Sequence, residues 1–220
     1  MFETLTRETK ERRMMEALAR AGASCRGGVA MSHADRERWD TRYRTGGYSR
    51  TPSRFVASYA PSPRQGARAV DIACGAGRNT LHLATLGYQV DAVDVSPEAL
   101  AVLRREAERL GVADRLTIIE ADLDVWRPAP NYYDLAVQIG FYDPWLLPSL
   151  GAAVVRGGLV IIETMNLVMR TRRIDFALSH AMPRGTLAAA FARWDILCYS
   201  DSAGAFGERS HIVARRPVCR

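Results

Sequence analysis

Short apolar runs alternate along the chain with segments in which apolar residues recur at helical spacing. Five of the runs predict buried strands, at residues 69–72, 88–94, 116–120, 133–139 and 159–163. The segments between them predict helices, at residues 78–86, 97–110 and 144–155. Strands that alternate with helices at this spacing are typical of the α/β class. The pattern therefore predicts a doubly wound, mostly parallel sheet.

The end of the chain breaks this alternation. After a predicted helix at residues 187–193, two apolar runs at 195–199 and 210–214 are separated by a loop that contains Gly204 and Gly207. This arrangement predicts a hairpin, so one of its two strands should run antiparallel to the rest of the sheet. The expected sheet therefore has seven strands and ends in an antiparallel hairpin.

The chain before the first strand divides into two parts. Residues 1–30 predict a separate helical extension, and residues 31–220 predict the main domain. Three interpretations of the extension stay open: a lid helix over a ligand, a peripheral appendage, and a segment upstream of a true start at Met31. We favour the appendage, with poor order at its beginning.

A second helix is predicted from Ser32 through Tyr43, with Trp39 and Tyr43 one turn apart on the same face. That face either packs on the domain or borders a ligand cleft. The following residues 45–53 are rich in turn formers and polar groups, which favours a loop that covers a substrate. Residues 54–59 predict a short helix before two prolines.

Composition limits the class of protein. A chain of 220 residues with 48% apolar and 25% charged residues is typical of one globular domain. It has no apolar run of about 18 residues and no apolar signal segment, so we expect neither a membrane helix nor secretion. Its four cysteines are scattered without a C-x-x-C pair, which predicts no disulfide framework, no metal site and a cytoplasmic setting.

The formal net charge is +6, and Lys10 is the only lysine. A basic balance is compatible with an anionic partner such as nucleic acid. The arginines are spread along the chain rather than clustered, so we interpret them as a general solvated surface and disfavour nucleic acid.

One glycine-rich stretch carries the candidate chemistry. It joins the strand at 69–72 to the helix at 78–86, and it contains Gly75 and Gly77. Glycines there let the backbone adopt positive φ and let a ligand approach the main chain closely. The next strand ends in Asp94, close to the roughly 20 residues expected between a nucleotide-binding turn and the acid that binds a ribose diol.

The details of the turn discriminate between nucleotides. A dinucleotide fingerprint needs a third small residue where this chain has Thr80. Asp71-x-Ala73-x-Gly75-x-Gly77 instead resembles motif I of the class I S-adenosylmethionine (SAM)-dependent methyltransferases, although that motif usually has glycine at the Ala73 position. With Trp39-Asp40-x-x-Tyr43, Pro52-Ser53-Arg54-Phe55 and Cys74-Gly75-x-Gly77-Arg78-Asn79, the chain resembles the tellurite-resistance and thiopurine-type small-molecule methyltransferases.

The resemblance implies a Rossmann-like fold with SAM as cofactor, and it implies roles for particular residues. Asp94 would hold the ribose hydroxyls, Val95 would pack on the adenine, and Asp122 with Leu123 would meet the adenine ring and its amino group. The strand-end acid and the glycine turn would line the methionine part. The implied cofactor site consists of Asp71, Ala73, Cys74, Gly75, Gly77, Arg78, Asp94, Val95, Asp122, Leu123 and Gln138.

The roles of several residues around the turn can be interpreted in more detail. Arg78 either fixes the turn or meets the SAM carboxylate, and its other interpretation is a surface salt bridge. The segment from Gln138 to Tyr142 would lie near the sulfonium. Cys74 is interpreted as a small buried residue rather than a nucleophile.

Methyl transfer from a sulfonium is an in-line displacement, and it needs a general base only when the nucleophile arrives protonated. Weak candidates for such a base are Tyr142, Asp143, His33 and Tyr43. The remaining histidines, His82, His180 and His211, are interpreted as structural.

The sequence favours a small-molecule acceptor with a thiol, chalcogen or oxygen nucleophile. The net charge of +6 motivates an RNA or protein methyltransferase as the alternative. Methyltransferases of base amino groups typically carry Asn/Asp-Pro-Pro-Tyr/Phe, and residues 140–145 do not match it. Two further hypotheses are an NAD(P)-dependent oxidoreductase, against which Thr80 and the terminal hairpin count, and a SAM-binding module without catalysis. The sequence identifies neither the acceptor nor the oligomeric state.

Overall fold

The computed structural model describes residues 33–167, 182–201 and 209–218, with side chains from residue 36 onwards. The predicted extension at residues 1–30 lies outside the described residues. The strands are β1 Arg68–Ile72, β2 Gln89–Asp94, β3 Leu116–Glu120, β4 Tyr133–Ile139, β5 Val154–Met165, β6 Asp195–Ser200 and β7 Arg209–Arg215. The helices are α2 His33–Arg44, α3 Arg54–Tyr59, α4 Arg78–Leu86, α5 Pro97–Leu110, the 3₁₀ turn η1 Ala113–Arg115, α6 Leu146–Ala153 and α8 Thr186–Ala190.

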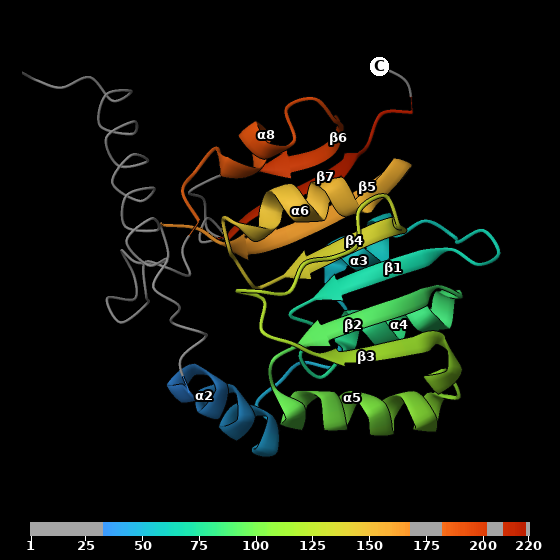
Figure 1. The fold of residues 1–220 in the computed structure, drawn as a ribbon, viewed down its shortest axis with the longest axis vertical. Coiled ribbons are helices and arrows are strands. Elements are labelled where there is room, and N and C mark those ends of the chain that lie inside the picture. Colours follow the sequence, from blue (N-terminus) through green and yellow to red (C-terminus); the bar gives the residue numbers. More distant parts are fainter. Residues whose placement is uncertain (1–32, 168–181, 202–208, 219–220) are drawn as a thin grey trace, which may run out of the picture.

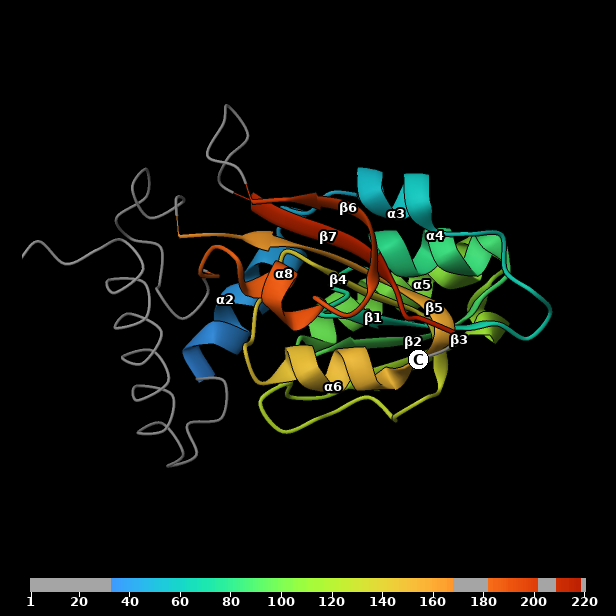
Figure 2. The same cartoon turned by 90° about the horizontal axis from the view of Figure 1, so that it is seen from above.

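The seven strands form one sheet in the order β3-β2-β1-β4-β5-β7-β6. Strands β1 to β5 pair in parallel, and β7 runs antiparallel to both β5 and β6. Helices α3, α4 and α5 cover one face, and α6 and α8 cover the other (Figures 1 and 2). This confirms the predicted doubly wound α/β sheet with its C-terminal antiparallel hairpin.

The core consists of two apolar layers, one on each face of the sheet. Because side chains alternate along a strand, Val70 and Ile72 of β1 pack on the α6 face, whereas Ala69 packs on the face of α3 and α4. The strand order reverses between β1 and β4. In sheets of this kind, ligands bind outside the carboxyl ends of the strands at that reversal.

The helix before β5 is shorter than the sequence pattern predicts, and β5 is longer. The apolar periodicity continues through Val154 and Val155, but α6 ends at Ala153 and the chain enters β5 directly. Val154 pairs with Tyr133 of β4. Both residues are β-branched and so favour a strand, and Val154 is fully buried in the sheet, which outweighs the helical periodicity here.

Candidate functional site

The backbone of the turn between β1 and α4 is left-handed at every second residue. Within the five residues from Ala73 to Gly77, Ala73, Gly75 and Gly77 have φ of 53°, 57° and 81°. Gly77 is also the N-cap of α4, and no side chain caps that helix end. The turn therefore bends sharply and leaves backbone N–H groups of the first helical turn without a side-chain cap.

Both glycines are also required by close packing. A Cβ atom on Gly75 would lie 2.3 Å from Oη of Tyr43, and one on Gly77 would lie 2.2 Å from Cδ1 of Leu103. Tyr43 comes from α2 and Leu103 from α5. The turn thus packs against two helices, α2 at Gly75 and α5 at Gly77, and neither glycine leaves space for a side chain.

Asp94 ties the turn to the next strand and helix. Its Oδ2 accepts a hydrogen bond from the Gly75 amide at 2.7 Å, and its Oδ1 accepts one from the Ser96 amide at 2.9 Å. The side chain is 8% exposed. Burial raises the pKa of Asp94, and hydrogen bonds from the backbone of Ser96, Gly75 and Val95 oppose the rise. A carboxylate has about four acceptor positions, so acceptor capacity is left for a ligand hydroxyl.

Asp71 lies deeper, behind the turn. It is 1% exposed, and its Oδ2 accepts a hydrogen bond of 2.6 Å from the hydroxyl of Thr80 on α4. Burial raises the pKa of Asp71 to about 7, and the hydrogen bonds of Thr80 oppose the rise. Thr80, which counts against a dinucleotide fingerprint, therefore has a structural role as the partner of this acid.

The other two side chains at the turn have different environments. Cys74 is buried, and burial raises the pKa of its thiol, so it packs as a small neutral residue. The Arg78 guanidinium lies 3.5 Å from the carbonyl oxygen of Thr51, in the loop between α2 and α3. This contact favours the interpretation of Arg78 as a residue that fixes the turn and its neighbouring loop.

The predicted adenine-side residues follow β2 and β3. The Ala121 amide donates to the carbonyl oxygen of Asp94 at 3.0 Å, which brings the segment after β3 beside the end of β2. Asp122 Oδ1 accepts a hydrogen bond from the Asp124 amide, and Leu123 is part of the core. Val95 is half-buried next to Asp94. The structure thus brings these residues to one edge of the sheet.

Gln138, at the end of β4, is fully buried. Its Nε2 donates to the carbonyl oxygen of Phe141 at 2.8 Å, which orders the loop after β4. Its Oε1 has no hydrogen-bond partner among the described residues. A buried acceptor without a partner costs free energy, so a donor on a bound ligand would stabilise it.

The base candidates are dispersed. Tyr142 packs in the core on the α6 face, and burial raises its pKa to about 12, so its phenol stays protonated at neutral pH. Asp143 accepts from the Trp145 amide at 2.9 Å, and burial raises its pKa. The side chain of His33 lies outside the described residues. Of the four candidates, Tyr43 has a described contact with the glycine turn.

A polar network that the sequence did not predict anchors the chain after α2. Asn79 Oδ1 accepts from the Ser53 amide at 2.9 Å, and the Ser53 hydroxyl donates to Glu163 of β5 at 3.2 Å. Arg209 of β7 donates to the other oxygen of Glu163 at 3.3 Å. The polar type of these four residues was the one signal in the sequence, and their pairing depends on the strand order.

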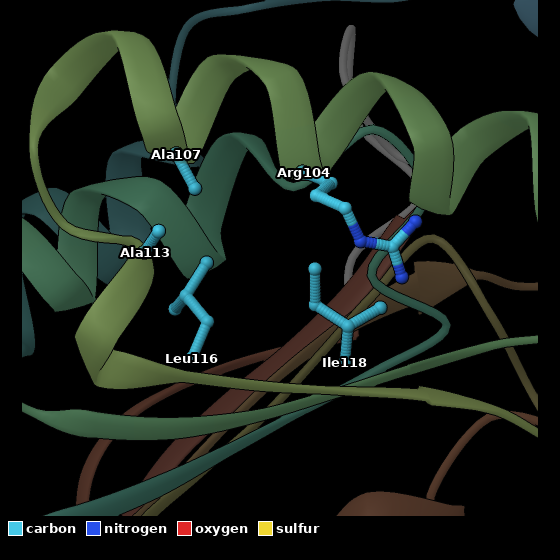
Figure 3. A pocket seen from close by; sticks show the side chains of 5 residues that line it. All are labelled: Arg104, Ala107, Ala113, Leu116 and Ile118. Atoms are coloured by element: carbon cyan, nitrogen blue, oxygen red, sulfur yellow. The ribbon is translucent and has the colours of Figure 1, made fainter.

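A hollow of about 250 Å³ lies elsewhere, between α5 and the edge strand β3 (Figure 3). Its lining residues are Arg104, Ala107, Ala113, Leu116 and Ile118. Leu116 begins β3, whereas Asp94 ends β2. The hollow therefore extends toward the amino end of the strands and is separate from the glycine turn.

Two broader findings concern the described residues alone. None of their helices is both long and apolar enough to cross a membrane. Within the same ranges, no group of three or more His, Cys, Asp and Glu side chains is placed to hold a metal ion.

Comparison with known proteins adds family information. Residues 69–150 match the sequence model of a methyltransferase domain family. Ubiquinone biosynthesis O-methyltransferase of Methylocella silvestris is 30% identical over 171 residues, which cover 67% of this chain and 65% of the relative. Ribosomal protein uL3 glutamine methyltransferase of Bordetella pertussis is 40% identical over 80 residues, 35% of this chain and 26% of that protein. The chain thus spans less than two thirds of these curated relatives.

Solved structures agree in fold. TehB from Haemophilus influenzae has a TM-score of 0.63 at 19% identity, covering 80% of this chain and 66% of that one. A SAM-dependent methyltransferase from Mesorhizobium loti has a TM-score of 0.59 at 18% identity, covering 73% and 95%. At this level of identity the likeness concerns the fold, and it confirms the predicted class I methyltransferase fold.

Proposed function

We propose that this chain, a class I SAM-dependent methyltransferase by family and fold, transfers the methyl group of SAM to a small-molecule acceptor. The cofactor is SAM, in keeping with the methyltransferase domain at residues 69–150. Structures similar in fold to this chain include geranyl diphosphate methyltransferases in complex with sinefungin or S-adenosylhomocysteine.

One observation carries the proposal: the bond between the Asp94 carboxylate and the Gly75 amide, at 2.7 Å. It joins the acid at the end of β2 to the glycine turn after β1, at the carboxyl edge of the sheet. Asp94 keeps acceptor capacity for ribose hydroxyls, and the missing side chain at Gly75 allows close approach of the methionine part. Gln138 Oε1, buried and without a partner in the described chain, would accept from the ammonium group of the methionine part.

The protein's contribution to the chemistry is mainly orientation. SAM, when bound, supplies a methyl group already activated on a sulfonium. The chain would hold that group and the acceptor in line and exclude water, which supplies much of the rate. The described base candidates favour acceptors that need little help with deprotonation, because Tyr142 is buried in the core with a pKa of about 12. A thiolate, a chalcogen anion or an acidic phenol fits this requirement.

The M. silvestris relative carries an O-methyltransferase name, which supports an oxygen acceptor within this class. A protein acceptor is the second candidate, because the B. pertussis relative is named as a glutamine methyltransferase of a ribosomal protein. An RNA acceptor is a further alternative, and its basis is the net charge of +6. An affinity for RNA that falls steeply as the salt concentration rises would support an RNA acceptor over a small molecule.

Calorimetric titration of the purified protein with SAM, S-adenosylhomocysteine and NADPH tests the proposal. We expect the first two to bind and NADPH not to bind. Asp94→Asn should weaken SAM binding by roughly 10- to 100-fold, the loss of one charged hydrogen-bonding group. Asp114→Ala, at an exposed acid of η1, is the matched control and should bind like the parent. If NADPH alone binds, the methyltransferase proposal is refuted and the oxidoreductase hypothesis takes its place.

The proposal includes two further predictions. Residues 1–30 are assigned to a helical extension apart from the catalytic domain, and the protein is assigned to the cytoplasm. Deletion of residues 1–30 followed by SAM titration addresses the first, since an appendage predicts unchanged affinity. Fractionation of cells that express the full chain addresses the second.

A further inference from the structure

The hydroxyl of Tyr43 lies directly on the glycine turn. A Cβ atom placed on Gly75 would be 2.3 Å from Oη, 3.1 Å from Cζ and 3.4 Å from Cε1 of Tyr43. The ring therefore points its hydroxyl at the bare Cα of Gly75. Burial raises the pKa of Tyr43, and the charge of the nearby Asp94 carboxylate adds to the rise.

These distances leave no layer of space between Tyr43 and the turn. A ligand atom needs about 3.5–4 Å to protein atoms on each side, so a bound ligand would need roughly 7 Å between the ring and Gly75. A nucleoside that uses Asp94 and approaches the Gly75 backbone would meet Tyr43 in the same place. The phenol and the ligand would therefore exclude each other.

We propose that α2 closes the cofactor site in the free protein, with Tyr43 as a plug over Gly75, and that SAM enters only after α2 moves away. This inference rests on the proposed function, because it concerns the same site. In Figure 1, α2 lies at the carboxyl ends of β2 and β3, beside the start of α5. That is the edge where Asp94 and the turn meet.

The contacts that hold α2 in place are weak enough to open. None of its residues from Arg36 to Arg44 is buried, so no apolar core contributes to its docking. Its docking contacts include the ion pairs Arg36–Glu120 at 2.5 Å and Arg44–Glu98 at 3.6 Å, which are solvent-exposed. Each such pair changes an equilibrium by a factor of up to about five.

One further contact completes this latch, which we define as the two ion pairs and the bond from the Ser96 hydroxyl to Asp40 Oδ1 at 2.5 Å. Ser96 also caps α5, and its amide donates to Asp94. Ser96 therefore contacts both α2, through Asp40, and the proposed ribose-binding acid Asp94. Salt should weaken the two exposed ion pairs by screening.

The backbone supplies a hinge after α2. Gly46 has φ of 75° with no atom near the position of an added Cβ, and Gly47 follows it directly. From Ser53 onwards the chain is fixed, because Ser53 is bonded to Asn79 and Phe55 of α3 is buried in the core. The amides of Gly46 and Gly47 donate to the carbonyl oxygens of Tyr43 and Arg42, and Arg42 Nε donates to the Gly47 carbonyl oxygen at 2.7 Å. These two glycines therefore move with α2, and the movement would be absorbed in residues 48–52 without disturbing α3.

The closed state should lower the apparent affinity in proportion to the fraction of molecules that are open. Removing the plug or the latch should therefore speed association. The test is stopped-flow binding of S-adenosylhomocysteine, followed by the fluorescence of Trp39, which lies on α2 with its ring centre 6.3 Å from that of Tyr43.

Three variants are compared with the parent protein. Tyr43→Ala removes the plug and should raise the association rate constant by about 3- to 10-fold, which reports the closed fraction. Arg36→Gln with Arg44→Gln breaks the two ion pairs of the latch but keeps the Ser96–Asp40 bond and Tyr43, and should raise the same constant by about 2- to 5-fold. Arg109→Gln, which breaks an α5 pair at 2.9 Å with Glu106, is the matched control and should leave it unchanged.

The outcomes separate the gate from the cofactor assignment. If Tyr43→Ala leaves association unchanged and only speeds dissociation, Tyr43 lines the occupied site and the gate is refuted. If association is equally fast in the parent and the latch variant at low salt, the latch is refuted. Binding in the variants alone would support a tightly closed gate. Absence of binding in every protein would refute the proposed SAM site itself, and thermal melting of each variant verifies that it is folded.

Discussion

Gly77→Ala gives a stringent test of how the glycine turn is packed. Gly77 has φ of 81°, and an added Cβ would lie 2.2 Å from Cδ1, 3.0 Å from Cγ and 3.3 Å from Cβ of Leu103. Leu103 is fully buried on α5. Since both Cγ and Cβ of the leucine are close, a rotation of its terminal methyl groups does not make enough room.

The expected cost has two parts. A left-handed conformation costs a residue other than glycine about 1–2 kcal/mol. An extra methyl group in a packed core costs about 1–3 kcal/mol. Gly77→Ala should therefore lower the free energy of unfolding by about 2–5 kcal/mol, which for a chain of 220 residues corresponds to roughly 4–20 °C in melting temperature.

The matched control is Gly111→Ala, at the C-cap of α5. Gly111 has φ of 67° but no atom within 4 Å of an added Cβ, so this variant should show the backbone cost alone. Urea unfolding gives the loss of unfolding free energy in each variant, and the difference between the two losses is the cost of the clash with Leu103. If Gly77→Ala is no more destabilising than Gly111→Ala, Leu103 does not pack against the turn as described. In the double variant Gly77→Ala/Leu103→Ala, the shorter side chain at position 103 should relieve part of the clash. The loss of unfolding free energy in the double variant should therefore be smaller than the sum of the losses in the two single variants.

Three more predictions concern residues around the turn. Ala73→Gly should stabilise the protein by up to about 1 kcal/mol in urea unfolding, because glycine relieves the left-handed strain at φ 53° but gains chain entropy when unfolded; a loss of stability would contradict it. The pKa of Asp71 is about 7 when folded and near 3.8 otherwise, so the folded state binds its proton more tightly and stability should fall by about 4 kcal/mol between pH 4 and pH 8. Asp71→Asn should remove that part of the pH dependence, and parallel curves would refute it. Asn79→Ala should cost about 1–3 kcal/mol, because the buried amide of Ser53 loses its acceptor; an unchanged urea midpoint would contradict that.

The part of the candidate site that consists of the glycine turn and Asp94 can be predicted from the sequence, because its residues lie close together along the chain. Gly75 and Asp94 are 19 residues apart and are joined by one hydrogen bond. One strand–helix–strand unit spans that interval, and its parallel pairing brings the two strand ends together. Ser96 and Pro97, predicted as the start of α5, are the N-cap and first residue of that helix. Local signals therefore suffice to bring the turn and its acid together.

The remainder depends on contacts that span the chain. Ser53 and Glu163 are 110 residues apart, and their bond exists because β5 lies beside β4 and α3 packs on that face. The bond of Arg36 to Glu120 spans 84 residues. No periodicity in the sequence specifies either partner, since both ends are polar residues of a kind common on surfaces. The aromatic spacing of Trp39 and Tyr43 indicated a face of α2, but not that Tyr43 reaches Gly75.

This division between local and distant contacts bears on function. The part of the site formed by β1, β2 and the turn is fixed by hydrogen bonds within 19 residues, so it changes little if distant surfaces change. We expect the acceptor to meet residues from α2, the loop before α3, β5 and β7. The last three are joined by exposed or half-buried polar contacts at Glu163, and α2 is joined to α5 by an exposed ion pair. Such contacts each contribute little to stability and can be replaced without loss of the fold. A methyltransferase built in this way can keep its cofactor chemistry while its acceptor changes, so the acceptor should be sought by varying exposed residues of the second group, with Arg209 first.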